Sequence, residues 1–302
     1  MNKTLSTASK LVLAGGLLCV SAQASALRSC NTADVKITSV SMFSDTTSSA
    51  TLQTIYSGSQ GAADCAGAFA GNDAFYPTTN LGYAGDGLLN GGTQNGSGGG
   101  TLFPGGAFIT PQYPLQDLDK DGKATDPGWI MLGKYQELSK DGPWAFVPNT
   151  IGGHSDIVTS SFFTATISTA GKGTWAFTPD ATVAQRTSTI LGRNYFDQFA
   201  LVFKAGDSFS VYDFTPDLFH MPPPDVDDPV MNWFGTYDVS GTLRAGGKDG
   251  LKNPAGLSHI SLWVRDPAAT VQTTTTQVPE PSTLALLGVS AAALIRTRRK
   301  TA

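Results

Sequence analysis

The stretch FALVFKAGDSFSVYDF, residues 199–214, decides the expected fold. Its first five residues, Phe199–Phe203, are apolar on both faces of a β-strand and form a short run, which is typical of a central strand. Lys204-Ala205-Gly206-Asp207 predicts a turn, and Asp207–Phe214 follows as a second strand. The stretch therefore predicts a β-hairpin whose first strand lies inside a sheet.

Gly256–Asp266 alternates with a period of two, the pattern of a strand with one buried face. The expected buried face consists of Ile260, Leu262 and Val264, and the expected outer face consists of His259, Ser261, Trp263 and Arg265. Further strands are predicted at Val35–Met42, Thr51–Tyr56, Ile157–Thr169, Thr174–Thr178, Thr182–Ile190 and Trp233–Val239. Strands punctuated by Gly, Pro and Asp, with almost no helical periodicity, predict an all-β fold, an antiparallel β-sandwich or jelly roll.

The charge balance argues against partners that carry phosphate. Without the two ends of the chain, the body keeps 14 basic and 23 acidic residues, so it carries about nine net negative charges. Such a body is not expected to bind nucleic acid or anionic surfaces. Glu137 is the single Glu of the body, and this preference for Asp argues against a helical domain, because Asp favours turns and caps.

The N-terminus has the three regions of an export signal. Lys3 and Lys10 are basic, Leu11–Val20 is apolar, and Ala24-Ser25-Ala26 offers small residues for cleavage. Residues 1–26 are therefore expected to be a helical signal peptide, cleaved after Ala26 or after Ala24. Export leaves two cysteines, and an even number in an oxidising compartment predicts one disulfide, between Cys30 and Cys65.

The C-terminus combines a short motif, an apolar run and a basic end. Val278-Pro279-Glu280-Pro281-Ser282-Thr283 precedes the uncharged run Leu284–Ile295, and Arg296-Thr297-Arg298-Arg299-Lys300 follows. As a helix the apolar run reaches about 18 Å, whereas a bilayer core of about 30 Å needs about 20 apolar residues. The basic cluster favours the cytoplasmic side of a membrane. The segment predicts a short hydrophobic helix that inserts transiently, with a terminal helix of the folded body as the alternative.

This arrangement resembles the C-terminal tail of PEP-CTERM proteins, which exosortase, a membrane enzyme of Gram-negative bacteria, recognises and processes. The resemblance implies that Pro279, Glu280 and Pro281 form the sorting motif and that exosortase is a partner. It also implies an inner-membrane stage before the protein reaches the outer cell surface or the extracellular matrix. The chain is then divided into a signal peptide at 1–26, a β-sandwich body at 27–267, a Thr-rich linker at 268–277 and the sorting signal at 278–300.

The body is also similar to the bodies shared by many PEP-CTERM proteins. The similarity rests on the following segments: Cys65-Ala66-Gly67 through Gly71-Asn72-Asp73, Asp126-Pro127-Gly128-Trp129 to Gly133-Lys134, Leu201–Tyr212 and Leu257–Leu262. It implies an extracellular β-protein associated with exopolysaccharide or the cell surface, and it supplies no catalytic residues.

Asp117-Leu118-Asp119-Lys120-Asp121-Gly122-Lys123 has the spacing of the first half of an EF-hand calcium loop. Asp117, Asp119, Asp121 and the backbone carbonyl oxygen of Lys123 are the expected ligands, because calcium prefers hard oxygen ligands. The twelfth position of the loop is Gly128 instead of a bidentate Glu, and Asp126 lies two residues early. The alternative interpretation is an acidic, solvated turn without a metal.

Other patterns predict no chemistry. Gly128–Lys134 has the spacing of a phosphate loop, but Tyr135 stands where Ser or Thr should hold magnesium, so a strand is expected there. The three histidines, His154, His220 and His259, form no zinc-binding pattern. The sequence has no Gly-x-Ser-x-Gly elbow of a serine hydrolase.

Trp263, on the expected outer face of its strand, is the candidate for stacking on a sugar ring. The expected function is a structural or adhesive role without enzymatic activity, in a surface or matrix protein of a biofilm that works with extracellular polysaccharide or other surface proteins. One alternative is a carbohydrate-binding module that depends on calcium, the one expected cofactor. The other is a secreted hydrolase, which needs a cleft with two carboxylates of raised pKa.

Overall fold

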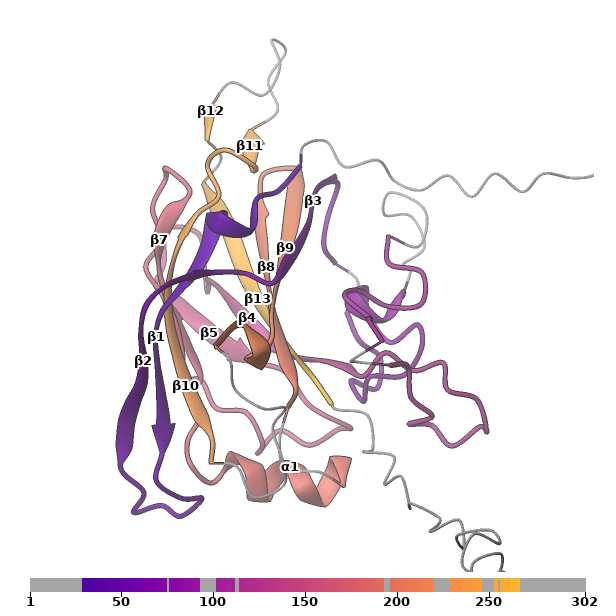
Figure 1. Ribbon diagram of the computed structural model, residues 1–302. Coiled ribbons are helices and arrows are strands. Elements are labelled where there is room, and N and C mark those ends of the chain that lie inside the picture. Colours follow the sequence, from indigo (N-terminus) through magenta and orange to yellow (C-terminus); the bar gives the residue numbers. More distant parts are fainter. Residues whose placement is uncertain are drawn as a thin grey trace, which may run out of the picture.

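The protein consists of two antiparallel β-sheets packed face to face, with a layer of loops beside one of them (Figure 1). The computed structural model describes residues 29–74, 76–92, 102–111, 114–192, 196–219, 229–245, 253–254 and 256–266. The predicted all-β antiparallel sandwich is confirmed. The expected signal helix at 1–26, the linker at 268–277 and the short hydrophobic helix within 278–300 lie outside the described residues.

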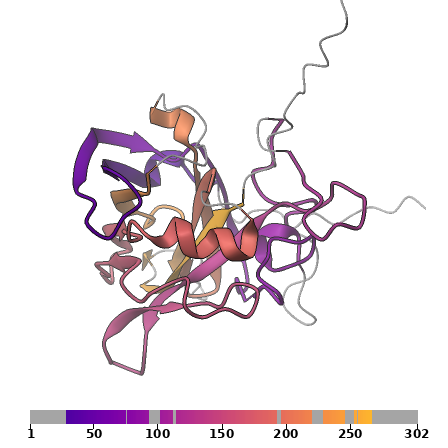
Figure 2. The same ribbon diagram turned by 90° about the horizontal axis from the view of Figure 1, so that it is seen from below.

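The first sheet has five strands in the order β2 (Leu52–Gly61), β1 (Val35–Phe43), β10 (Met231–Asp238), β7 (Lys172–Phe177) and β6 (Phe163–Ala165). The second sheet has six strands in the order β3 (Asp64–Ala70), β9 (Ser208–Phe214), β8 (Gln198–Ala205), β13 (Leu257–Arg265), β4 (Trp129–Glu137) and β5 (Trp144–Pro148). A short pair, β11 (Arg244–Ala245) and β12 (Asn253–Pro254), projects at the top of Figure 1. The helical segments are η1 (Thr32–Asp34), η2 (Leu88–Asn90), α1 (Val183–Leu191) and η3 (Pro216–Phe219). Seen from below, α1 crosses the lower end of the sheets (Figure 2).

The hairpin predicted from residues 199–214 is confirmed as β8 and β9. The two strands pair from Phe199 with Phe214 to Ala205 with Ser208, and every residue of both strands is buried. Gly206 forms the turn with a φ of 49°, a left-handed conformation that favours glycine. β8 lies between β9 and β13, so the apolar character of both its faces did indicate an interior strand.

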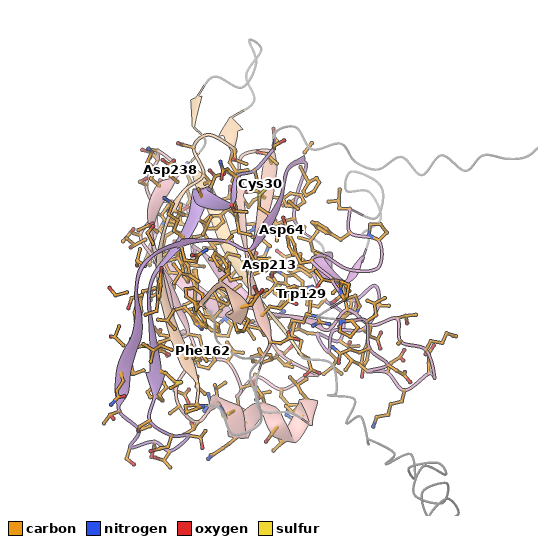
Figure 3. The ribbon with its side chains drawn as sticks, in the orientation of Figure 1. Cys30, Asp64, Trp129, Phe162, Asp213 and Asp238 are labelled. Atoms are coloured by element: carbon orange, nitrogen blue, oxygen red, sulfur yellow. A yellow bond between two sulfur atoms is a disulfide. The ribbon has the colours of Figure 1, made fainter. Side chains whose placement is uncertain are left out.

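Aromatic side chains fill the space between the two sheets. The rings of Phe199 and Phe214 stack with centroids 4.8 Å apart, and Trp175 of the opposite sheet contacts Phe199 edge-on at 6.0 Å. Gly235 makes room for this indole, because a Cβ atom there would lie 2.4 Å from the ring of Trp175. Phe162 lies in the lower part of the same interior (Figure 3). The sandwich therefore has one continuous aromatic core.

The outer face of the six-stranded sheet is buried as well, which corrects the prediction that β13 has only one buried face. Trp263 lies on the face opposite Leu262, as predicted, but its exposed fraction is 2%, so the expectation that it is open to a glycan was wrong. The physical reason is a segment distant in sequence: the described parts of residues 71–127, which we call the loop layer, cover this face (Figure 1, right). Leu89 and Phe103 of the loop layer belong to a second apolar cluster with Trp129 and Trp263.

Two asparagine side chains attach the loop layer to the edge of β4. β5 pairs with β4 only from Gly133 to Glu137, so the backbone groups of Trp129 and Met131 need other partners. The side chain of Asn90 accepts the N–H of Trp129 (2.9 Å) and donates to its carbonyl oxygen (2.7 Å). Asn80 makes the same pair of bonds with Met131, at 2.8 and 2.9 Å. Each side-chain amide thus takes the place of a residue in a neighbouring strand.

The strand predicted at Thr182–Ile190 is wrong, because these residues form most of α1. Val183 and Thr187, four positions apart, are buried on one helical face. The hydroxyl group of Thr187 donates to the carbonyl oxygen of Val183 (3.1 Å), so this β-branched residue is accommodated within the helix. Of the strand predicted at Ile157–Thr169, only the three residues of β6 are strand.

The predicted disulfide between Cys30 and Cys65 is confirmed. It joins the segment before η1 to β3, at the upper end of the sandwich (Figure 3). The backbone N–H of Cys30 also donates to the carbonyl oxygen of Gly67 (2.9 Å), which holds this segment along β3. The bond therefore links the start of the described chain to the six-stranded sheet.

Replacing both cysteines with serine is expected to lower the free energy of unfolding by about 3–4 kcal/mol, because a cross-link over 35 positions restricts the unfolded chain. Chemical denaturation of the double variant measures the loss, and the unsubstituted chain in reducing buffer provides a second arm. Equal denaturation midpoints for the oxidised and reduced chains would contradict a stabilising role.

Candidate functional site

The predicted sorting residues Pro279, Glu280 and Pro281 lie beyond the described residues, which end at Asp266. In the ranges that the structure covers, no helix has the length and apolar character needed to cross a bilayer. The structure does show where the tail leaves the body. This point is the end of β13, toward the lower end of the sheets (Figure 1).

Arg265 holds this end of β13 in place, and its side chain is fully buried. The guanidinium group donates to the carbonyl oxygens of Pro127 (2.8 Å) and Pro114 (2.6 Å). It also forms an ion pair with Asp197 at 2.7 Å. The arrangement joins β13 to two points of the loop layer and to the residue that precedes β8.

The fixed end of β13 limits how far the tail can reach. The side-chain amide of Gln116 donates to the carbonyl oxygen of Asp266 (2.6 Å), so the last described residue is also held. Thirteen peptide bonds separate Asp266 from Pro279, and this length spans at most about 45 Å when fully extended. The sorting motif is therefore tethered within that distance of the lower end of the body.

The carboxylates of Asp117, Asp119 and Asp126 converge in the loop layer. One oxygen atom from each lies within 4.8 Å of the others, which is close enough for them to share a cation. Asp117 and Asp119 are two of the four predicted calcium ligands. The third, Asp121, is outside this group and forms an ion pair with Lys123 at 2.9 Å.

Asp126 is the member of the group that the calcium-loop spacing did not predict. Its buried carboxylate accepts the backbone N–H groups of Ala84 (2.7 Å), Leu118 (2.7 Å) and Asp119 (3.1 Å). The carbonyl oxygen of Lys123, the fourth predicted ligand, accepts a backbone N–H two residues further on (2.9 Å). The calcium-loop pattern has Glu at its twelfth position, which is Gly128 here. The one signal in the sequence was that the acidic residue Asp126 lies two positions earlier.

The acidic turn has a negative electrostatic potential that reaches a neighbouring tyrosine. Burial, together with the charges of Asp119, Asp126 and Asp86, raises the pKa of the Tyr83 hydroxyl group. Carboxylate oxygens are the hard ligands that calcium prefers. In this turn, however, Lys123 already pairs with Asp121, and Asp126 already serves three backbone donors.

A second group of charged residues lies under the loop layer, at the opposite end of β13. Oδ2 of Asp73 lies 2.7 Å from Nε2 of His259 and 3.7 Å from Nζ of Lys134. Lys134 also donates to the hydroxyl group of Tyr76 (2.9 Å), and its Nζ lies 4.3 Å from the centroid of that ring. Asp73 is one of the first residues of the loop layer, whereas Lys134 belongs to β4 and His259 to β13. The cluster therefore attaches the start of the loop layer to these two strands.

Electrostatics keep the carboxyl group of Asp73 ionised. Burial by itself would raise its pKa, but the hydrogen bond from His259 and the charges of His259, Lys134 and Lys204 lower the pKa below its usual value. Burial also lowers the pKa of Lys204, against the opposing effect of Asp73. The second oxygen of this carboxylate, Oδ1, has no hydrogen-bond partner within the described residues. Asp73 thus serves as a counter-ion shared among several basic groups.

The same cluster lacks the geometry of a serine hydrolase. The hydroxyl group of Ser261 donates to the carboxylate of Asp73 (3.4 Å) and not to the imidazole of His259. A serine nucleophile needs the base itself within hydrogen-bond reach. Sequence reasoning did not connect Asp73 with His259, because 186 positions separate them and no local pattern joins them.

Asp213 is a buried carboxyl group of another kind (Figure 3). Burial raises its pKa well above the usual value, although the side-chain amide of Gln198 donates to both of its oxygens at 3.1 and 3.2 Å. A glycosidase needs two carboxyl groups that face the substrate. Asp213 has an exposed fraction of 3%, so it offers no surface to a substrate in this structure.

The substitution Asp73→Asn is expected to lower the free energy of unfolding by about 3 kcal/mol at neutral pH, because Lys134 then stays buried without its counter-ion. The folded-state pKa of Asp73 is lowered, so its contribution is complete above the unfolded pKa of about 3.9. The contribution disappears as the pH falls through the folded pKa. The difference between the two proteins should therefore narrow below about pH 4, as measured by denaturation across the pH range.

Asp238→Asn is the matched control, because the ion pair of Asp238 with Lys172 (2.7 Å) lies on the surface. Its loss is expected to change the free energy of unfolding by less than about 1 kcal/mol. Equal losses for the two variants, or a difference that grows in acid, would contradict the anchoring role of Asp73.

Comparison with known proteins identifies the tail of this chain. The model of the PEP-CTERM protein-sorting motif matches residues 277–300, which include the whole predicted sorting signal at 278–300. No curated protein and no solved structure matches the chain significantly. The chain therefore carries the PEP-CTERM sorting signal, which exosortase recognises and which marks an exported, cell-surface protein.

Proposed function

We propose that this protein is a structural or adhesive component of the outer cell surface or the extracellular matrix, where its body associates with exopolysaccharide in a biofilm. The observation that carries the proposal is the sorting signal at residues 277–300. It is joined to a body in which a disulfide and two packed sheets fix the chain. A durable body delivered to the surface suits a scaffold or an adhesin.

The positions of the two ends of the described chain support this role. The chain enters beside the disulfide at the upper end of the sandwich and leaves from β13 toward the lower end (Figure 1). The β11–β12 pair projects from the upper end. A protein held through its tail, whether during processing at the inner membrane or afterwards, would present the upper end and the sides of the sandwich to its surroundings.

The contacts made by three buried charged residues support a role without catalysis. Arg265 of β13 binds backbone carbonyl groups of the loop layer, Asp126 binds backbone N–H groups within that layer, and Asp73 pairs with side chains of β4 and β13. All three side chains are buried in the described structure. These charges hold the loop layer together and attach it to the six-stranded sheet, so we propose that the body is not an enzyme.

Replacing Pro279, Glu280 and Pro281 together with alanine is expected to block processing, because exosortase then meets a tail without its stiff, extended motif. In cells that contain exosortase, the variant should accumulate uncut in the inner-membrane fraction, while the unsubstituted protein reaches the surface or matrix fraction. Cell fractionation and intact-mass measurement of the C-terminus report both properties.

Ser282→Ala with Thr283→Ala is the matched control, since these residues adjoin the motif without belonging to its Pro-Glu-Pro core. The control should be processed as the unsubstituted protein is. The matrix association is tested on the processed protein, which should be released when the polysaccharide is degraded. Normal processing of the triple variant, or a processed protein that never accompanies the polysaccharide, would contradict the corresponding part of the proposal.

A second candidate function, carbohydrate binding that depends on calcium, is favoured by one observation. Asp117, Asp119 and Asp126 bring a carboxylate oxygen each to within 4.8 Å of the others. A bound calcium ion would tie this exposed turn to the buried part of the loop layer through Asp126. Glycan affinity would then fall when a chelator removes the ion.

Asp117→Asn with Asp119→Asn is expected to abolish the heat of calcium binding in isothermal titration calorimetry, because two charged ligands are lost. Asp121→Asn is the matched control, since Asp121 pairs with Lys123 and lies outside the group. Unchanged binding by the double variant would contradict a calcium site here. Loss of binding in the control would show that the EF-hand spacing, and not the observed grouping, supplies the ligands.

A further inference from the structure

The outer face of the five-stranded sheet carries a groove with a volume of about 360 Å³. It is lined by parts of β1, β6, β7 and β10, all strands of one sheet, and by Thr166, which follows β6. Five threonines and one aromatic ring define its surface: Thr38, Thr164, Thr166, Thr174, Thr236 and Phe234. The groove lies on the side of the sandwich opposite to the loop layer (Figure 1).

The side chains of the groove form two rows across the strands. In the first row, Thr236 is paired with Thr174, whose hydroxyl group lies 3.1 Å from that of Thr166. In the second row, Phe234 is paired with Ala176, and Ala176 is paired with Thr164. Neighbouring strands are about 4.8 Å apart, so each row presents groups at a regular short spacing. The sheet thus offers hydroxyl groups in one row and an aromatic ring with a methyl group in the next.

This face is open, in contrast to the outer face of the other sheet. Thr164, Thr166, Thr174 and Thr236 are exposed, and Phe234 is half-buried. Among the described residues, the groove has no layer comparable to the one that covers Trp263. The exposed position of several threonines around a partly exposed ring therefore makes this a hydroxyl-rich surface.

The groove is electrically neutral, although the body carries about nine net negative charges. All ten residues that line it are uncharged. At its margin, Lys172 and Asp238 neutralise each other in an ion pair of 2.7 Å, and Lys36 of β1, which is paired with Thr236, adds a positive charge beside the first row. An anionic polymer would meet the negative field of the body and find no cluster of basic side chains here. The charge pattern favours a neutral ligand.

A neutral saccharide chain has the chemistry that this surface complements. Its hydroxyl groups both donate and accept hydrogen bonds, as threonine hydroxyl groups do. The apolar C–H face of a sugar ring can pack on Phe234. We propose that this groove binds a neutral segment of extracellular polysaccharide. The proposal rests on the matrix function proposed above and assigns it a site.

The test uses the full chain and polysaccharide from the matrix of the producing cells, separated by ion exchange into neutral and anionic fractions and immobilised. The variant Thr174→Lys with Thr236→Lys places two charged, long side chains on the first row. Its affinity for the neutral fraction is expected to be at least about tenfold weaker. The matched control is Thr51→Lys, the same substitution at an exposed position next to β2 and outside the groove.

A milder variant keeps the test decisive if the lysine pair does not fold. Thr174→Val with Thr236→Val removes both hydroxyl groups and preserves the branched shape that β-strands favour. This variant is expected to bind the neutral fraction several-fold more weakly while its melting temperature and circular dichroism stay close to those of the unsubstituted chain. A selective loss in these variants, absent from Thr51→Lys, supports the groove.

The remaining outcomes distinguish a failure of the groove as a binding site from a failure of the proposed polysaccharide association. If the unsubstituted chain binds neither fraction, both the polysaccharide association and the groove are overturned. If it binds and the groove variants bind equally well, or if it binds only the anionic fraction, the groove is overturned while the association stands. If light scattering shows a dimer that the lysine pair converts to a monomer, the face is an interface between two copies, and the glycan site is overturned.

Discussion

Both faces of the six-stranded sheet must be shielded from water, and the rest of the body is arranged around this constraint. Phe203 and Leu262 point toward the five-stranded sheet, while Val202 and Trp263 belong to the apolar cluster on the other side. Exposing apolar surface is unfavourable by about 25 cal/mol per Å², so neither face can remain bare. The five-stranded sheet covers one face and the loop layer covers the other.

The backbone N–H and C=O groups of loops that cover a sheet need hydrogen-bond partners, whereas helices would pair these groups internally. The side chains of Asn80 and Asn90 meet this demand along the edge of β4, and the carboxylate of Asp126 collects three backbone N–H groups within the loop layer. Two buried groups of charged side chains lie at the two ends of β13, with Asp73 at His259 and Asp197 at Arg265. Apolar contacts thus fill the middle of the face, while polar bonds fix the loops at its borders.

The two sheets consequently differ in what they offer to a partner. The six-stranded sheet is covered on both faces and supports the loop layer, whose acidic turn is its most charged exposed feature. The five-stranded sheet keeps one face open, with threonines around Phe234. A surface protein that is delivered by its tail can present both features outward, and neither requires the chain to rearrange.

The sequence by itself determined the properties that depend on neighbouring residues. A short apolar run and a turn placed β8 and β9, and period-two alternation placed β13. The even number of cysteines left after export predicted the disulfide. The sorting signal was also legible, because it is a linear motif. Tertiary structure decided the rest. Thr182–Ile190 has β-branched residues that favour a strand locally, yet packing of one face made it a helix. Trp263 is buried, and Asp73 contacts His259, because the loop layer packs on β13. Contacts between residues so far apart in sequence leave no local pattern that could predict them.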